Sequence, residues 1–211
     1  MKYATDSVSA AEGIRVEEWL PKDSREHASR AADIDAEIGM LAEVLHAVVH
    51  AGAGVSFFTP FSIDEARAFW VDKVLAEVRA GRRRVLVARL GDINMLNRRI
   101  VGTVQLELEM PPNQQHRAAV AKLLVHPDAR RFGIGRALMI ALEEMARSER
   151  RTLLTLDTVS GSNAELLYRS LDFIAAGVIP RYARGALTPE LEGTTIMYKE
   201  LTPAEAVMSF A

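Results

Sequence analysis

The sequence predicts a single domain of mixed α/β class, with a central, mostly antiparallel twisted sheet flanked by about four helices. Stretches with helical spacing of apolar residues alternate with strand-like stretches, no shift in composition divides the chain, and its 211 residues can bury a sizeable core. The expected element order is βααβββαβαββ. We expect the domain to span residues 13–202, between a flexible tail at 1–12 and a short tail at 203–211.

A strand and two helices are expected in the first part of the chain. Residues 14–19 form the first predicted strand. Apolar residues spaced three and four apart predict a helix over 33–51. The second helix, over 62–81, is expected to begin with a capping box, because Ser62 and Glu65 stand three residues apart before an apolar face.

Three predicted strands follow, over residues 85–90, 100–110 and 118–125. In the second of them, polar residues that include Thr103 and Gln105 alternate with apolar ones, so we expect one face of this strand to be exposed. The third is almost continuously apolar, which predicts a position in the middle of the sheet.

Two helices and three strands are expected in the remainder of the chain. The predicted order is a helix over 133–149, a strand over 152–158, a short helix over 162–171, and strands over 173–179 and 194–201.

Charge and composition restrict the partners. The 26 Lys and Arg and the 28 Asp and Glu give a net charge of -2, so we expect a small-molecule partner and neither nucleic acid nor membrane. The chain has no cysteine, and His116 and His126 have no partner at metal-ligand spacing, so no metal is expected. No apolar stretch is long enough for a membrane span or resembles a signal peptide, which predicts a cytoplasmic protein. A monomer and a homodimer are both compatible with these features.

A basic turn interrupted by glycines lies between the strand over 118–125 and the helix over 133–149. The first N–H groups of a helix have no intrahelical partner and lie at the positive end of its dipole, which favours an anion there. The residues expected to bind this anion are Arg130, Arg131, Phe132, Gly133, Ile134, Gly135 and Arg136. Leu138 stands where the dinucleotide-binding fingerprint requires a third glycine or alanine, so a Rossmann dinucleotide site is not expected. The chain also has no P-loop motif, so nothing in the sequence supports nucleotide hydrolysis.

The turn resembles the acetyl-CoA pyrophosphate loop of the GNAT superfamily of N-acetyltransferases. Arg130, Gly133 and Gly135 meet its R/Q-x-x-G-x-G/A pattern. Residues 163–173 resemble the Asn-and-Tyr helix of the same superfamily, with Asp172 in place of the usual glycine. The resemblance implies a GNAT-like domain that uses acetyl-CoA as cosubstrate.

Within the superfamily, residues 49–55 and 156–158 resemble tabtoxin-resistance-type acetyltransferases. This resemblance implies transfer of an acetyl group to the primary amine of a small, amino-acid-like molecule. A chain without cysteine cannot form a covalent acyl-thiol, so direct attack in a ternary complex is expected. The alternatives are acetylation of a protein amine and a non-catalytic acyl-CoA-binding or regulatory module.

The resemblance also implies individual roles. Backbone groups of Leu123, Leu124 and Val125 would pair with the pantetheine arm and polarise the thioester carbonyl. Asn163 would contact the cofactor. Tyr168 would be the general acid that protonates the departing thiolate, because a phenol with a pKa near 10 roughly suits a thiol with a pKa between 8 and 9.

The general base has several candidates. Asp157 matches an acidic position of the tabtoxin-resistance type and could accept the amine proton or bind the ammonium. That type carries a second acid where this chain has Ala119, so His116, His126 or a water are alternatives. Asp157 could equally be a carboxylate that ends a strand, and Tyr168 a tyrosine packed in the core.

Two further features have two interpretations each. The aromatic residues Phe57, Phe58, Phe61 and Trp70 could line an acceptor pocket or belong to the core. His50 lies beside a glycine-rich loop, where it could contact substrate or be a structural or exposed histidine.

Overall fold

A computed structural model of the protein describes residues 13–20, 28–91 and 99–202. Both predicted tails and most of the polar connection after residue 90 lie outside the described residues. Side chains of the first helix are described from Asp33 onward. Among the described helices, none combines the length and apolarity that a membrane span requires.

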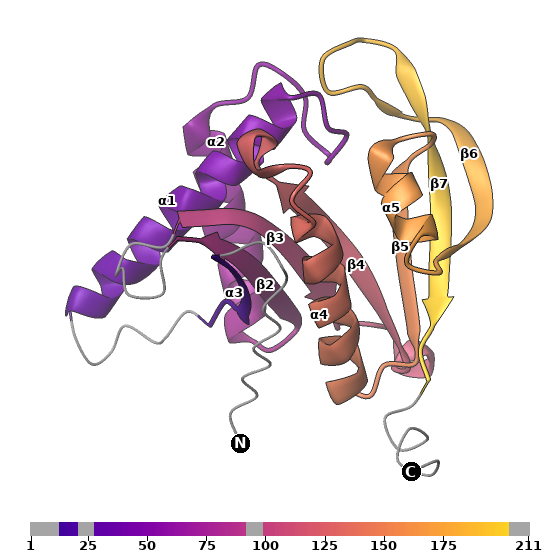
Figure 1. Ribbon diagram of the computed structural model, residues 1–211, viewed down its shortest axis with the longest axis horizontal. Helices are drawn as coiled ribbons and strands as arrows, with labels where there is room; N and C mark the ends of the chain where they lie inside the picture. Colours follow the sequence, from indigo (N-terminus) through magenta and orange to yellow (C-terminus); the bar gives the residue numbers. More distant parts are fainter. Residues whose placement is uncertain (1–12, 21–27, 92–98, 203–211) are drawn as a thin grey trace.

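Seven strands form one sheet in the order β1-β2-β3-β4-β5-β7-β6 (Figure 1). All neighbouring strands are antiparallel except β4 and β5, which are parallel. The strands are β1 (Ile14–Glu18), β2 (Arg83–Leu90), β3 (Arg99–Glu107), β4 (Arg117–Val125), β5 (Leu153–Val159), β6 (Ile174–Arg184) and β7 (Leu191–Glu200). With the helices, this confirms the predicted mixed α/β class and the order βααβββαβαββ.

The helices occupy the predicted places with shifted ends. They are α1 (Ala28–His50), α2 (Ile63–Ala68), the π-helical η1 (Phe69–Leu75), α3 (Ala76–Arg79), α4 (Ile134–Ser148) and α5 (Asn163–Arg169), with short 3-10 turns at Pro112–Gln114 and Pro127–Ala129. The segment from α2 to α3 is the second predicted helix, with a π-helical middle. Its capping box is present, because the Glu65 N–H donates to Ser62 Oγ and the Ser62 N–H donates to the Glu65 carboxylate.

Each face of the sheet is covered by its own apolar cluster. Val85 and Val87 of β2 pack with α1 and the α2–α3 segment, whereas Leu86 and Ala88 point to the opposite face and pack with α4. Figure 1 shows the sheet between these helices. The centre of the sheet is therefore buried on both faces.

The prediction that β3 has one exposed face is wrong. Thr103 and Gln105, at the polar positions of the alternating pattern, are both 0% exposed. Arg83 of the neighbouring strand donates to Gln105 Oε1 at 2.9 Å and so satisfies part of its hydrogen-bonding capacity. The alternation correctly indicates a strand, but helices cover both of its faces.

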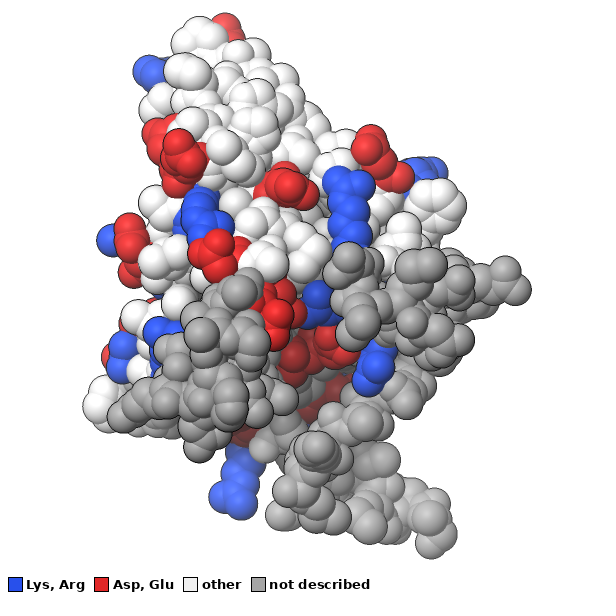
Figure 2. Space-filling model, turned by 90° about the vertical axis from the view of Figure 1, so that its left-hand side faces the viewer, with Lys and Arg blue, Asp and Glu red and all other residues white. Residues whose placement is uncertain are grey.

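The face that includes α1 carries charges of both signs. Figure 2 shows basic and acidic side chains interspersed over it. Arg67 of α2 pairs with Asp35 of α1, and Arg89 of β2 pairs with Glu37 of α1. Each of these pairs joins α1 to a neighbouring element on this face.

The sheet opens between β4 and β5. The two strands pair only from Arg117 with Leu153 to Ala119 with Thr155. Beyond these positions β4 continues to Val125 and β5 to Val159, with no pairing between them. The edge of β4 that faces β5 therefore has backbone groups without a strand partner.

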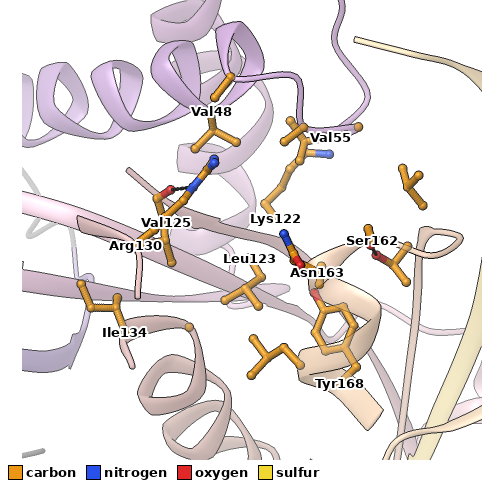
Figure 3. Close-up of a pocket in the computed structure, with 18 of the residues that line it drawn as sticks. Val48, Val55, Lys122, Leu123, Val125, Arg130, Ile134, Ser162, Asn163 and Tyr168 are labelled. Carbon is orange, nitrogen blue, oxygen red and sulfur yellow. Dashed lines mark hydrogen bonds between the residues drawn. The ribbon is translucent and has the colours of Figure 1, made fainter. Parts of the chain in front are cut away.

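A β-bulge lies in β4 beside this opening. Thr103 of β3 is opposite Leu124 and Gln105 is opposite Ala121, so the segment between Ala121 and Leu124 has one residue more than its partner. Lys122, inside the bulge, has the left-handed φ of 50°. The bulge sends the lysine side chain toward the loop that follows α1 (Figure 3).

Candidate active site

A cleft of about 640 Å³ occupies the opening between β4 and β5. The segments that line it are the loop after α1, the second half of β4, the basic turn with the start of α4, the end of β5, and α5. Figure 3 shows Tyr168 and Asn163 of α5 near Leu123 of β4, while Arg130 and Ile134 flank the turn. The cleft thus lies where the strand pairing fails.

Most of the predicted site residues lie together in this cleft. The predicted cofactor-binding residues in its lining are Leu123, Val125, Arg130, Arg131, Gly133, Ile134, Gly135, Arg136 and Asn163. Both predicted catalytic residues, Asp157 and Tyr168, line it too. Residues from four separate segments of the sequence therefore share one space.

Two predicted cofactor-binding residues do not line the cleft. The Leu124 side chain is 1% exposed and packs in the cluster on the α1 face, because alternate residues of a strand point to opposite faces. Phe132 is 62% exposed at the tip of the turn. Neither side chain contributes to the wall of the cleft.

The basic turn has the backbone geometry of an anion site. Arg131 and Gly133 have left-handed φ values of 72° and 78°. A Cβ atom on Gly133 would meet no atom within 4 Å, so the space in front of the turn is open. This open space adjoins the start of α4, whose helix dipole and unpaired N–H groups favour negative charge.

Gly135 serves a different purpose from Gly133. A Cβ on Gly135 would lie 3.1 Å from Cδ2 of Leu167, so this glycine lets α4 pack closely against α5. Arg136 strengthens the same contact, because its guanidinium donates to Ser170 Oγ at 2.7 Å. The second glycine of the motif therefore positions α5, and with it Tyr168, against the cleft.

Tyr168 is buried beside the cleft. It is 6% exposed, and its ring centroid lies 5.7 Å from that of Phe173. Burial raises the pKa of its phenol well above the ordinary value, and the negative charge of Asp157 raises it further. The phenol therefore keeps its proton at neutral pH, and its pKa is less well matched to that of a thiol than the sequence suggested.

Asp157 is exposed to the cleft where β5 ends. Thr194 Oγ1 of β7 donates to its Oδ2 at 3.4 Å. Its negative charge contributes to the raised pKa of Tyr168 and opposes the lowering of the pKa of Lys122. All three residues line the cleft.

The histidines considered as bases lie elsewhere. None of His50, His116 and His126 is among the residues that line the cleft. His50 is exposed and its Nδ1 bonds to the carbonyl of His46 at 2.9 Å, while His126 accepts from the Asp128 N–H. The structure therefore brings Asp157 to the cleft and leaves these histidines outside it.

Lys122 lines the cleft, although no functional role was predicted for it. Its Nζ donates to Ser56 Oγ at 3.1 Å and lies 5.8 Å from the ring centroids of Phe57 and Phe69. Burial lowers its pKa, although the charges of nearby carboxylates, Asp157 among them, oppose the shift. The signal that could have indicated it was a lone lysine within an otherwise apolar strand.

A second cavity, of about 260 Å³, adjoins the cleft. The lining residues common to both are Gly54, Ser56, Asp157, Val159 and Glu192. Phe57 and Phe58 line the second cavity, whereas Phe61 and Trp70 are buried in the core. Of the four aromatic residues singled out in the sequence, two therefore line a cavity and two belong to the core.

Glu192 of β7 is a functional candidate that the sequence did not indicate, because it precedes the last predicted strand. Its Oε2 lies 3.7 Å from the position that a Cβ on Gly54 would take, so its carboxylate reaches the loop after α1. Among the described residues, no cluster of three or more His, Asp and Glu side chains could hold a metal ion.

Comparison with known proteins identifies the family. Residues 55–173 match the acetyltransferase (GNAT) family. A GCN5-related N-acetyltransferase from Kribbella flavida superposes with a TM-score of 0.67 at 21% identity, over 90% of this chain and 99% of that one. Salmonella typhimurium yncA, solved with its cofactor acetyl-CoA, has a TM-score of 0.66 at 17% identity, over 90% and 95%. A candidate phosphinothricin N-acetyltransferase has a TM-score of 0.64 at 13% identity, over 90% and 99%.

The residues of the cleft fit acetyl-CoA. The open space at Gly133 and the start of α4 suits its phosphates, with Arg130 and Arg131 at the rim. The unpaired edge of β4 offers backbone groups to its amide-bearing arm, and the cleft extends from there to Tyr168. The chain belongs to the GNAT acetyltransferase family and is an N-acetyltransferase that uses acetyl-CoA.

Proposed function

We propose that the protein acetylates the primary amine of a small, amino-acid-like molecule, as its resemblance to tabtoxin-resistance-type acetyltransferases implies. One observation carries the proposal. Asp157 lines both the cleft that fits acetyl-CoA and the smaller cavity beside it. An amine held by Asp157 from the smaller cavity therefore lies at the boundary of the cofactor cleft, where transfer has to occur.

The cleft supplies binding and orientation. Bound acetyl-CoA contributes a thioester carbonyl that an amine can attack. Arg130, Arg131 and the start of α4 bind negative charge at one end of the cleft, and Asn163 lies in its wall. Backbone groups of Leu123 and Val125, on the edge of β4 that β5 leaves unpaired, orient the acyl arm and polarise its carbonyl.

Asp157 and Tyr168 have complementary roles in this proposal. The Asp157 carboxylate attracts the ammonium form of the acceptor and takes its proton at a carboxylate oxygen, which leaves a nucleophilic amine. Tyr168 keeps its proton at Oη, because burial and Asp157 raise its pKa. Since no described residue hydrogen-bonds to this hydroxyl, it is available to donate to the departing sulfur.

The small volume of the second cavity favours a free amine over a protein amine. At about 30 Å³ per water, its 260 Å³ correspond to about nine water molecules. Such a space accommodates an amino acid as a whole, which supports a compact acceptor.

The test is release of CoA from acetyl-CoA across amino acids, small amines and short peptides. A thiol reagent can be used directly, because the protein has no cysteine. We expect turnover with small amines, and a loss of about 100-fold in kcat for Tyr168→Phe with acetyl-CoA binding retained. The matched control is Tyr198→Phe, which changes a β7 tyrosine outside the cleft.

Two results would overturn the proposal. Turnover with peptides alone would make the protein a protein-amine acetyltransferase. Acetyl-CoA binding without turnover on any acceptor would make it a non-catalytic acyl-CoA-binding module.

A further inference from the structure

The second cavity carries groups of opposite charge at different parts of its wall. Asp157 and Glu192 lie on the side that it shares with the cofactor cleft. Arg184 of β6 lines the second cavity but not the cleft. A ligand that bridged these groups would present a cationic end to the cleft and an anionic end away from it.

Glu192 is held at this boundary without a partner of its own. In the described part of the chain, no side chain pairs with its carboxylate. Its two oxygens lie near Gly54 and Gly185, where a Cβ would be 3.7 Å and 3.4 Å away. A carboxylate between two glycines, open to both cavities, is free to accept hydrogen bonds from a ligand.

Arg184 is similarly available. Its guanidinium lies 5.8 Å from the ring centroid of Phe58, a contact with an aromatic face that leaves the N–H groups unused. No acidic side chain within the described residues forms an ion pair with it. The planar guanidinium can therefore bind a carboxylate in bidentate fashion.

The remaining wall is largely aromatic. Phe57 and Phe58 come from the loop after α1, and Tyr182 comes from β6. Phe57 is fixed by Phe61, with ring centroids 4.6 Å apart, and by Phe69, at 5.4 Å. Such a wall is suited to the apolar body of a ligand, and the polar groups fix its orientation.

We infer that the second cavity binds a primary amine that also bears a carboxylate, as a free amino acid does. Asp157 and Glu192 hold its ammonium at the boundary with the cleft, and Arg184 holds its carboxylate. Glu192 of β7 thereby provides a second carboxylate beside Asp157, in place of the acid that tabtoxin-resistance-type enzymes carry at the position of Ala119. This inference rests on the proposed function and names the residues that select the acceptor.

Matched pairs of acceptors test the inference. L-phenylalanine is compared with 2-phenylethylamine, and L-leucine with 3-methylbutylamine, because the members of each pair differ only in the carboxylate. We expect kcat/KM to favour the amino acid by about tenfold or more. Arg184→Met is expected to abolish that preference by slowing the amino acid and leaving the amine unchanged. Arg181→Met, on the same strand but outside both cavities, is the control.

Glu192 is tested separately as a residue that binds the acceptor. Glu192→Gln keeps the shape of the side chain and removes its charge. We expect it to raise KM about tenfold for both members of each pair, with kcat and the KM for acetyl-CoA little changed. Glu200→Gln changes an exposed glutamate at the end of the same strand and is the control.

The outcomes separate this inference from the proposed function. If the wild type had equal kcat/KM values for the amino acid and the corresponding amine, the inference would be overturned. The same holds if Arg184→Met lowered both values equally. In either case the proposed acetylation of small amines would still stand. Turnover of peptides but of neither member of a pair would overturn the inference and the small-amine proposal. Absence of CoA release with every acceptor would overturn both.

Discussion

Gly54 and Val159 approach so closely that a Cβ added to Gly54 would lie 2.5 Å from Cγ2 of Val159. The contact joins the loop after α1 to the end of β5, and both residues line both cavities. Real Cβ atoms essentially never come this close to another heavy atom, so the Val159 side chain or the loop would have to shift. The boundary between the two cavities therefore depends on a residue without a side chain.

Gly54→Ala is expected to impair acceptor use more than acetyl-CoA binding. Displacement of the loop widens the boundary and misplaces the amine, which lowers kcat/KM for the amine by about 10- to 100-fold. Overpacking costs about 1–3 kcal/mol of stability. Gly177→Ala is the control, because Gly177, like Gly54, has no left-handed φ, but it has open space around it and lies outside both cavities. Unchanged kinetics in Gly54→Ala would contradict the prediction.

The two glycines of the basic turn are expected to respond differently to alanine. Gly133→Ala places a methyl group in the open space of the anion site, at a φ of 78°, so acetyl-CoA affinity falls and stability drops by about 1–2 kcal/mol. Gly135→Ala presses against Leu167 and displaces α5. Calorimetric titration with acetyl-CoA and urea unfolding measure the two effects.

Leu167→Ala provides the discriminating control for these two variants. It removes the atom that Gly135→Ala meets, so the double variant is expected to lose less stability than the sum of the losses in the two single variants. In combination with Gly133→Ala, the same change is expected to restore neither the stability nor the affinity for acetyl-CoA. Rescue of Gly133→Ala by Leu167→Ala would show that the turn acts through packing and not through its open space.

Lys122→Met is expected to stabilise the protein at neutral pH. Because burial lowers the pKa of Lys122, the folded state disfavours its protonated form. The wild type therefore gains stability as the pH rises through this lowered pKa toward 10.5, and the advantage of Lys122→Met shrinks over the same range. Urea unfolding between neutral and alkaline pH measures the difference. Lys73→Met, at an exposed lysine, should show no such convergence.

Glu165→Gln is expected to destabilise the protein by about 1–3 kcal/mol at neutral pH. The carboxylate of Glu165 accepts from the Gly161 N–H at 2.7 Å, from Arg169 at 2.6 Å and from Thr195 at 3.2 Å, and these bonds hold its pKa below the ordinary 4.5. This contribution is present in full above pH 4.5 and is lost as the pH falls through the lowered pKa.

Unfolding of the wild type and Glu165→Gln across the acidic range tests this prediction. The two curves should converge as the pH falls. Glu144→Gln, an exposed position on α4, should follow the wild type throughout. A gap between the wild type and Glu165→Gln that stayed constant down to the lowest pH would show that packing, and not charge, is responsible.

Local signals made most of the fold predictable. Ser62 and Glu65 mark a helix start within four residues, and the basic turn before α4 marks an anion site because a helix N-terminus has the same chemistry in any fold. The burial of Gln105 depends instead on α1, whose contact with β3 no window of sequence contains. The periodicity of apolar residues therefore predicts whether a segment is a helix or a strand better than it predicts which faces of that element are buried.

The parts of the candidate site that escaped prediction depend on strand pairing. The side chain of Lys122 reaches the cleft through a bulge defined by the register of β3 and β4. Glu192 reaches the boundary because β7 pairs with β5, which brings it near Asp157 and Gly54. Both positions look ordinary in the sequence, since register is a property of two strands together.

The hairpin of β6 and β7 also bears on how this enzyme and its kin could diverge. The match to the GNAT family ends at residue 173, before Tyr182, Arg184 and Glu192. The matched segment contains most of the residues that line the acetyl-CoA cleft, whereas these three residues of the proposed acceptor cavity lie beyond it. Substitutions in this hairpin are therefore expected to alter the choice of acceptor while the segments that bind acetyl-CoA stay in place.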